Sequence, residues 1–174
     1  MVETAPYDVV RRIGDVEIRS YPRLIFATVT GRGDDGPFNL LVNYIGGDNK
    51  GRSKISMTTP VLTSEKVEMT APVITRGDSM SFVLPSRYTS ETAPEPSNSR
   101  VLIHEMPART LAVIRFRGYA RQSSESEHTR TLLDSLAENR IETVGEPVLM
   151  RYNAPWTPGF MRRNEIAIEI NEKN

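Results

Sequence analysis

Residues 24–47 read LIFATVTGRGDDGPFNLLVNYIGG and join a strand pattern to a helix pattern. The first seven residues are rich in β-branched and aromatic side chains and stop at Gly31, which predicts a strand over 24–30. After Pro37, apolar residues recur at i, i+3, i+4 and i+7, the spacing of one helix face: Phe38, Leu41, Val42 and Ile45. Pro37 suits the first turn of a helix, and Gly46 suits the position just past its end.

A second helix is predicted to begin near Ser124. Ser124 and Glu127, three residues apart, have the pattern of a capping box, and Arg140 suits the negative end of a helix. The apolar stripe of this segment consists of Thr129, Leu132, Leu133 and Leu136.

The remaining regular segments read as strands. They are a hairpin over 7–21 around Gly14-Asp15, and single strands at 79–85, 101–103, 111–116, 148–152 and 166–170. Each predicted helix therefore has strands before and after it, joined by short, turn-rich connections instead of regular βαβ alternation. This order favours an α+β domain, in which two helices pack against an antiparallel sheet that can curl into a barrel.

Length and composition narrow the function classes. The 174 residues fit one domain spanning 1–174, and no run approaches the roughly 18 apolar residues of a membrane-spanning helix. Lys+Arg and Asp+Glu each number 22, so no global basic field attracts nucleic acid or a membrane surface. With no cysteine, thiol nucleophiles and thiolate metal sites are excluded. The N-terminus lacks a secretory pattern, so we expect a soluble, cytoplasmic protein, with a monomer favoured.

Several residues have both a functional and a structural interpretation. The sequence Met-Thr-x-Pro-Val occurs at 57–61 and 69–73, which indicates two equivalent strand ends or a strand and its returning partner. Met57, Met69 and Met80 can present thioether ligands or a soft apolar surface to a flat ligand, and they equally suit core packing. His104 and His128 lack the convergent partners of a metal site or a catalytic triad, which favours structural roles.

The late loop carries the other candidates. Trp156 lies between Pro155 and Pro158, where a large aromatic side chain either lines a ligand site or caps the end of a barrel. In the run 162–165, two arginines precede an asparagine and Glu165, an arrangement that suits anion capture or an Arg–Glu pair that holds the loop.

Five sequence segments together resemble the SOUL haem-binding family, in family order over about residues 7–170. They are Glu17-Ile18-Arg19-Ser20-Tyr21, Tyr44-Ile45-Gly46-Gly47-Asp48-Asn49, the Met-Thr-x-Pro-Val pair, Phe116-Arg117-Gly118, and Tyr152 to Glu165. The resemblance implies a distorted antiparallel β-barrel built from two βαββ-like halves with two flanking helices. It also implies that haem or another tetrapyrrole is held in an apolar groove between the first helix and the loop before the last strand.

Carried over by position, the resemblance assigns the groove to the residues Phe38, Leu41, Val42, Ile45, Trp156 and Phe160, with Arg162 and Arg163 as cations. The basic residues that contact haem propionates in relatives correspond here to Asp35, Asn43 and Thr157, and the proposed axial histidine corresponds to Ser20. Propionate pairing then falls to other cations, namely Lys50, Arg52, Lys54, Arg162 or Arg163.

Three hypotheses follow. The first is a tetrapyrrole carrier or buffer, because a groove without a fixed axial ligand has little control of haem electronics. The second is an enzyme in which Glu165 is a general base and Tyr152 or Tyr44 a proton donor, which requires Glu165 to face a pocket instead of an arginine. The third is a ligand-free interaction domain, which requires a wholly buried first-helix stripe and no concavity beside Trp156.

Overall fold

The chain folds as two βαββ halves that share one curled sheet. The computed structural model describes residues 3–31, 33–50, 70–76 and 78–172. The first half consists of β4 (Leu24–Thr30), α1 (Pro37–Gly46), β6 (Thr70–Arg76) and β7 (Ser79–Val83). The second half consists of β10 (Arg109–Arg117), α2 (Gln122–Glu138), β11 (Glu142–Arg151) and β12 (Arg163–Asn171). The predicted α+β fold is confirmed.

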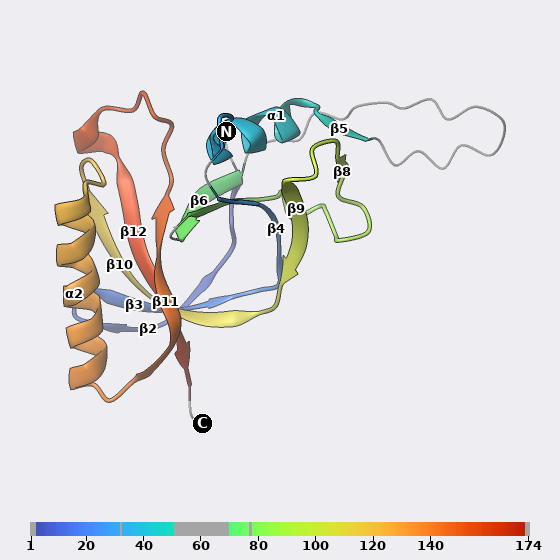
Figure 1. The fold of residues 1–174 in the computed structure, drawn as a ribbon. Coiled ribbons are helices and arrows are strands. Elements are labelled where there is room, and N and C mark those ends of the chain that lie inside the picture. Colours follow the sequence, from blue (N-terminus) through green and yellow to red (C-terminus); the bar gives the residue numbers. More distant parts are fainter. Residues whose placement is uncertain (1–2, 32, 51–69, 77, 173–174) are drawn as a thin grey trace, which may run out of the picture.

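The strand order shows the relation between the two halves. The order β10-β12-β11 of the second half mirrors β6-β7-β4 of the first, and the halves meet where β11 pairs antiparallel with β6. Figure 1 shows the resulting sheet curled around its own inner face, with α1 and α2 on the outside of different parts of it. The remaining short elements are β1 (Glu3–Thr4), β2 (Asp8–Ile13), β3 (Val16–Tyr21), β5 (Asn49–Lys50), β8 (Glu95–Pro96), β9 (Val101–Met106) and the 3₁₀ turn η1 (Gly159–Met161).

Helix α1 has its buried face rotated from the predicted stripe. Pro37 occupies its first turn as expected, but the helix includes Gly46 and ends at Gly47, whose φ of 120° needs a glycine. The residues buried against the sheet are Leu40, Leu41 and Tyr44. Phe38 and Val42 remain more than one-third exposed. The helix has apolar residues on more than one side, and only one of these sides can pack against the sheet.

Helix α2 begins two residues before the predicted start. Arg121 is its N-cap and makes no side-chain cap, so the capping box predicted at Ser124 is wrong: Ser124 already lies within the helix. Its carbonyl oxygen lies 2.7 Å from Nδ1 of His128, whose ring stacks on Phe116 with centroids 4.4 Å apart. Of the predicted stripe, Leu132 and Leu136 are buried.

Three apolar clusters divide the core. One lies between α1 and strands β4, β7 and β9, and a second lies between α2 and strands β3, β10, β11 and β12. The third lies inside the curl of the sheet and includes Leu111 and Val113, which alternate along β10 with Ala112 and Ile114 of the second cluster. The strands therefore bury side chains on both faces.

The predicted strands are present, with one large difference in extent. Strand β11 begins at Glu142, six residues before the predicted start at Val148, and its register with β12 shifts between Val144 and Val148. The second copy of the repeat runs into β6, whereas the first copy, with Met57, and also Met69 lie outside the described residues. Within the described ranges, no helix is long and apolar enough to cross a membrane.

Candidate functional site

A cavity of 350 Å³ lies where the first helix meets the loop between β11 and β12. We call it the α1 cavity. It is lined by Phe38, Val73, Met80, Tyr119, Ala120, Arg151, Asn153, Ala154, Pro155 and Arg162. Both halves contribute, since the first three residues come from α1, β6 and β7 and the others from the second half.

The first half supplies an apolar wall. Phe38 at the start of α1 is 36% exposed and packs edge-on against Phe82, with ring centroids 5.8 Å apart. Val73 and Met80, which are partly buried, pack against the cluster beneath α1. Leu40 and Leu41 of α1 are buried in the core, whereas the Phe38 ring lines the cavity.

The opposite wall is a loop held in shape by Arg162. Its Nε donates a 2.7 Å hydrogen bond to the carbonyl oxygen of Thr157, and Nη2 donates another to the carbonyl oxygen of Pro155. The guanidinium also lies 4.6 Å from the centroid of the Tyr119 ring. Gly159 permits this packing, because a Cβ atom there would lie 2.6 Å from Cε2 of Tyr119. Arg162 therefore shapes the cavity wall as well as lining it.

Arg151 is the less constrained of the two cations. Its side chain is 39% exposed, and the ion pair between its Nη2 and Oε1 of Glu125 is long, at 3.9 Å. A long, half-exposed pair of this kind contributes little to stability, so the guanidinium can rearrange toward an anionic group at small cost. Arg151 thus adds a usable positive charge to a largely apolar cavity.

Only two of the eight predicted site residues line this cavity, Phe38 and Arg162. Leu41 is fully buried, Val42 is exposed, and Ile45 packs against the core beneath α1. Trp156 and Phe160 are 85% and 76% exposed in the loop that continues from the cavity wall. Of the other cations named from sequence, Lys50 pairs with Glu95 at 3.6 Å, and Arg52 and Lys54 lie outside the described residues.

The sequence-based site missed Val73, Tyr119 and Arg151. Tyr119 directly follows the Phe116-Arg117-Gly118 motif, and Val73 belongs to the second copy of the repeat, so both stood beside recognised motifs. Arg151 closes β11, and nothing in the local sequence distinguishes it from other exposed arginines. Its position at the cavity follows from the pairing of β11 with β6, where Arg151 is opposite Val73.

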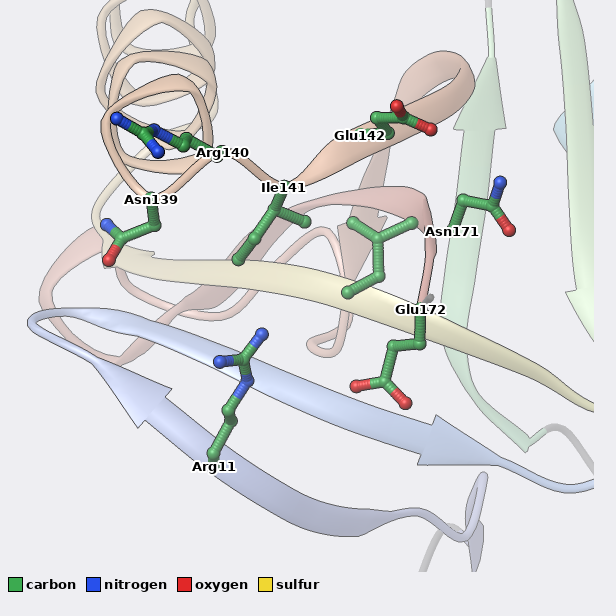
Figure 2. Close-up of a pocket in the computed structure, with 8 residues that line it drawn as sticks. Arg11, Asn139, Arg140, Ile141, Glu142, Asn171 and Glu172 are labelled. Carbon is green, nitrogen blue, oxygen red and sulfur yellow. The ribbon is translucent and has the colours of Figure 1, made fainter. Parts of the chain in front are cut away.

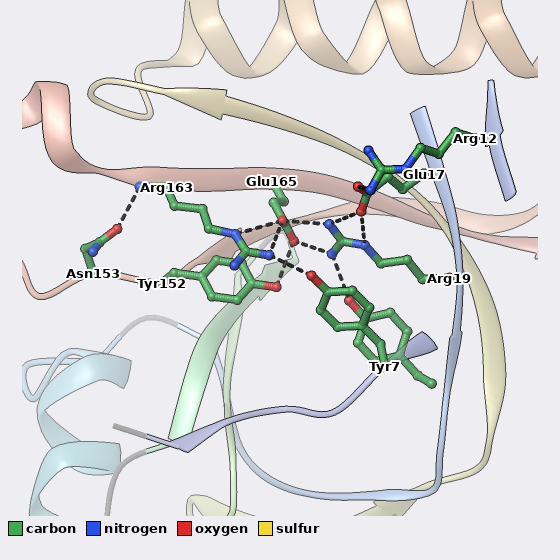
Figure 3. Close-up of polar contacts among 9 residues, drawn as sticks. Tyr7, Arg12, Glu17, Arg19, Tyr152, Asn153, Arg163 and Glu165 are labelled. Carbon is green, nitrogen blue, oxygen red and sulfur yellow. Dashed lines mark hydrogen bonds and ion pairs between the residues drawn. The ribbon is translucent and has the colours of Figure 1, made fainter. Parts of the chain in front are cut away.

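Arg163, the last of the eight predicted site residues, belongs to a buried network centred on Glu165 (Figure 3). Arg19 donates two hydrogen bonds to the Glu165 carboxylate, at 2.8 and 2.9 Å. Arg163 donates two more to Oε1, at 3.0 and 2.7 Å, and the hydroxyl of Tyr152 donates one to Oε2 at 2.7 Å. The Tyr7 ring packs over the Arg19 guanidinium, with 4.1 Å between the ring centroid and Cζ of Arg19. Both carboxylate oxygens are fully engaged.

This network rules against Glu165 as a general base. Burial by itself would raise the pKa of Glu165, but the hydrogen bonds and charge of Arg19, with the hydrogen bonds of Tyr152 and Arg163, hold that pKa below its usual value. Burial and the charge of Glu165 raise the pKa of Tyr152. A general base needs a free lone pair facing the proton that it takes, and Glu165, which is 0% exposed, has none. The catalytic interpretation of Glu165 is therefore wrong, and the paired interpretation is confirmed.

A larger cavity, of 420 Å³, lies at the far end of α2 (Figure 2). Its residues are mostly polar and carry charges of both signs: Arg11, Asn139, Arg140, Ile141, Glu142, Ile170, Asn171 and Glu172. Figure 2 shows the charged side chains spread around it without convergence on one point. Such a surface does not suit an apolar macrocycle, so the α1 cavity is the better candidate for one.

Comparison with known proteins agrees with the architecture. A family model described as "SOUL heme-binding protein" matches residues 2–169. "Heme-binding protein 2" of Mus musculus is 30% identical over 178 residues, which cover 97% of this chain and 84% of that protein. "Heme-binding protein 1" of Xenopus tropicalis is 25% identical over 132 residues, which cover 72% of this chain and 65% of that relative. The chain thus spans just under two thirds of the length of the Xenopus protein.

Solved structures with similar folds are more distant in sequence. A protein from Listeria innocua described as a hydrolase superposes with a TM-score of 0.56 at 12% identity, covering 93% of this chain and 94% of that one. The C-terminal domain of EcmrR gives a TM-score of 0.55 at 12% identity, covering 96% and 99%. At this identity the likeness shows a shared fold and no shared activity.

Proposed function

Because the chain belongs to the SOUL heme-binding protein family, we propose that it binds haem or a related tetrapyrrole in the α1 cavity and acts as its carrier or buffer. The observation that supports this most directly is that Phe38 of α1 and the segment 153–155 line one cavity, although they are more than 100 residues apart in sequence. The resemblance seen in the sequence associates the ligand with these same two segments.

The side chains fit an apolar, planar acid. Phe38, Val73, Ala154 and Pro155 offer apolar contacts, and Arg151 and Arg162 supply positive charge for carboxylates. Met80 places a thioether among the lining residues, which is a ligand that haem iron accepts. A bound haem would bring a coloured, redox-active iron, and the residues of the chain would hold the macrocycle and keep water from one of its faces.

The affinity expected of such a site is moderate. Burying apolar macrocycle surface at about 25 cal/mol/Å² gives several kcal/mol, from which the cost of association is subtracted. A dissociation constant of about micromolar is therefore expected, and a sub-nanomolar one is not. Reversible binding of this strength suits a protein that releases its ligand again.

Titration of the protein with haem tests the proposal. We expect a saturable change in the Soret band together with quenching of Trp156, the sole tryptophan of the chain. Phe38→Asp should weaken binding at least about tenfold, because a charge enters the apolar wall. Leu133→Asp is the matched control: Leu133 on α2 is also 36% exposed but lies outside the α1 cavity.

The second variant addresses the propionates. Arg151→Gln should weaken haem binding by severalfold and leave the binding of an uncharged porphyrin ester unchanged, since only the free acid uses the guanidinium. Absence of any saturable change with the unaltered protein, or equal losses in Phe38→Asp and Leu133→Asp, would exclude haem binding in the α1 cavity.

A further inference from the structure

A smaller cavity, of 160 Å³, lies on the inner face of the sheet, behind the strands that border the α1 cavity. We call it the inner-face cavity. It is lined by Phe26, Thr28, Ile74, Arg76, Ser79, Ser81, His104, Met106, Arg109 and Val148. Successive residues of a strand point to opposite faces, so Met80 lines the α1 cavity while Ser79 and Ser81 line this one. The two cavities are separate sites.

Hydroxyl and imidazole groups line one wall of the inner-face cavity. Oγ1 of Thr28 lies 2.7 Å from Oγ of Ser81 and 2.8 Å from Nε2 of His104. The His104 ring packs edge-on against Phe26, with centroids 5.7 Å apart, which fixes its plane. These three polar groups come from the neighbouring strands β4, β7 and β9, and their mutual hydrogen bonds hold them in position.

Two arginines face the same cavity. The Arg109 side chain is only 13% exposed, and its ion pair with Glu169 is long, at 3.9 Å. Arg76 donates a hydrogen bond of 3.2 Å to the carbonyl oxygen of Glu146, which does not neutralise its charge. None of the ten lining residues in the described part of the chain is acidic. As far as the described residues line it, the cavity is therefore positively charged.

The pKa of Arg109 reflects the cost of placing two arginines beside one cavity. Burial lowers the pKa of Arg109, and the charge of Arg76 lowers it further, against the opposing effect of Glu169. A guanidinium that is mostly buried and weakly paired has several N–H donors in excess of its acceptors. An anion placed between Arg109 and Arg76 would supply the missing acceptors and the missing charge.

We propose that the inner-face cavity binds a small oxyanion, a carboxylate or phosphate group, between Arg76 and Arg109 on one side and the Thr28–Ser81–His104 groups on the other. The two guanidinium groups provide forked donors for paired oxygens, and the hydroxyls provide further donors. The volume of 160 Å³ is less than half that of the α1 cavity, which suits a small acid or a phosphate group better than a macrocycle.

The two histidines of the chain make this proposal directly measurable. In a ¹H–¹⁵N spectrum of the imidazole groups, His104 reports on the inner-face cavity. His128 of α2, whose ring stacks on Phe116, is an internal control. Inorganic phosphate and acetate are added in separate titrations to about 50 mM, a range that covers millimolar affinity, with chloride at matched ionic strength as reference.

We expect phosphate, acetate or both to shift the His104 signals saturably while those of His128 stay constant. Saturation by one anion alone assigns the site to that chemistry, and mutual competition assigns it to the shared oxyanion group. Shifts that fail to saturate, that chloride reproduces, or that affect both histidines equally would overturn the proposal.

Variants separate the cavity from general charge effects. Arg109→Gln should weaken anion binding at least about tenfold, because bonds to a charged group are lost. Arg115→Gln is the matched control: it removes the same charge from the same strand, at an exposed position outside the cavity. If Arg109→Gln does not fold, Arg76→Gln, at an exposed position, should still weaken binding severalfold. Unchanged affinity in a folded variant of either arginine would contradict the site, whatever the outcome of the haem titration.

Discussion

The two βαββ halves have the same order of elements and differ in how their strands are covered. In the second half, the 17-residue helix α2 covers one face of the strands, and the third apolar cluster and the Glu165 network lie on the other. In the first half, the ten-residue helix α1 covers less, and the strands border the α1 cavity on one face and the inner-face cavity on the other. Figure 1 shows how much shorter α1 is than α2.

This difference determines where the proposed haem site can lie. The long helix α2 packs Leu132 and Leu136 into the core, and the Glu165 carboxylate is fully paired, whereas the short helix α1 leaves an apolar side chain, Phe38, partly uncovered. The loop between β11 and β12 then completes the α1 cavity from the other half. The second half thus supplies the wall that closes the α1 cavity on the side opposite Phe38.

The largest expected effect is on the filled half. Glu165→Ala should lower the free energy of unfolding by about 3–5 kcal/mol, because it removes the fully buried carboxylate that Arg19 and Arg163 share and leaves the buried Arg19 with only the partly exposed Glu17 as a partner. Glu169→Ala on the same strand, where the carboxylate is 38% exposed and 3.9 Å from its partner, should change it by less than about 1 kcal/mol. Chemical denaturation of both variants measures the contrast, and similar losses would show that the network is not what stabilises this half.

Truncation of the buried helix residues compares the halves directly. Leu41→Ala on α1 and Leu132→Ala on α2 each remove a fully buried leucine and should each cost about 2–5 kcal/mol. Only Leu41→Ala should also weaken haem binding, because it loosens the helix that carries Phe38. Thermal unfolding and haem titration of the pair distinguish these effects; an equal effect of both variants on haem would break the comparison.

The pH dependence of stability should differ between the two inner faces. The pKa of Glu165 is held below its ordinary value of 4.5, so the unfolded chain takes up a proton first and stability is lost as the pH falls below that value. Burial lowers the pKa of His104 below 6.5, so its contribution is lost in the same direction but at higher pH.

Unfolding free energies measured from pH 8 to pH 3 should therefore fall in two stages. Glu165→Gln should remove the more acidic stage and His104→Gln the less acidic one. A Glu165→Gln protein that kept the full acid dependence would show that other carboxylates cause it.

The smallest expected effects are at the helix ends. Gly47 ends α1 with a φ of 120°, and Arg140 follows α2 with a φ of 57°, where a glycine would be unstrained. Gly47→Ala should destabilise the protein by about 1 kcal/mol, and Arg140→Gly should stabilise it by up to about 1 kcal/mol. Thermal unfolding measures both, and a destabilising Arg140→Gly would show that its side chain contributes more than its backbone costs.

Local sequence patterns predicted which segments form helices and strands better than they predicted which side of each segment is buried. The hairpin, both helices and most strands were predicted, because hydrophobic spacing and turn residues act over a few residues. The buried side of α1 was not, since apolar residues on several sides of this helix left the choice to packing against β4, β7 and β9. The bulged start of β11 was missed as well, because its residues before Val148 are mostly exposed and carry no alternating pattern.

The candidate site was predicted only in part. Phe38 and Arg162 line the α1 cavity, and the paired alternative for Glu165 was among those that the sequence left open. Its main partner could not be predicted, because Arg19 is 146 residues away in the chain and reaches Glu165 through the pairing of β3 and β12 with β10. Arg151 and Arg109 likewise acquire their surroundings only when distant strands come together.

The sequence by itself determined which segments become helices and strands and, through its family motifs, the βαββ architecture, since both depend on residues close together or on a recognisable order. Only the tertiary structure decided which charges are neutralised and which side chains border a cavity. Those properties depend on distances between residues far apart in the chain, and a distance of that kind exists only after the sheet has curled and its two halves have paired.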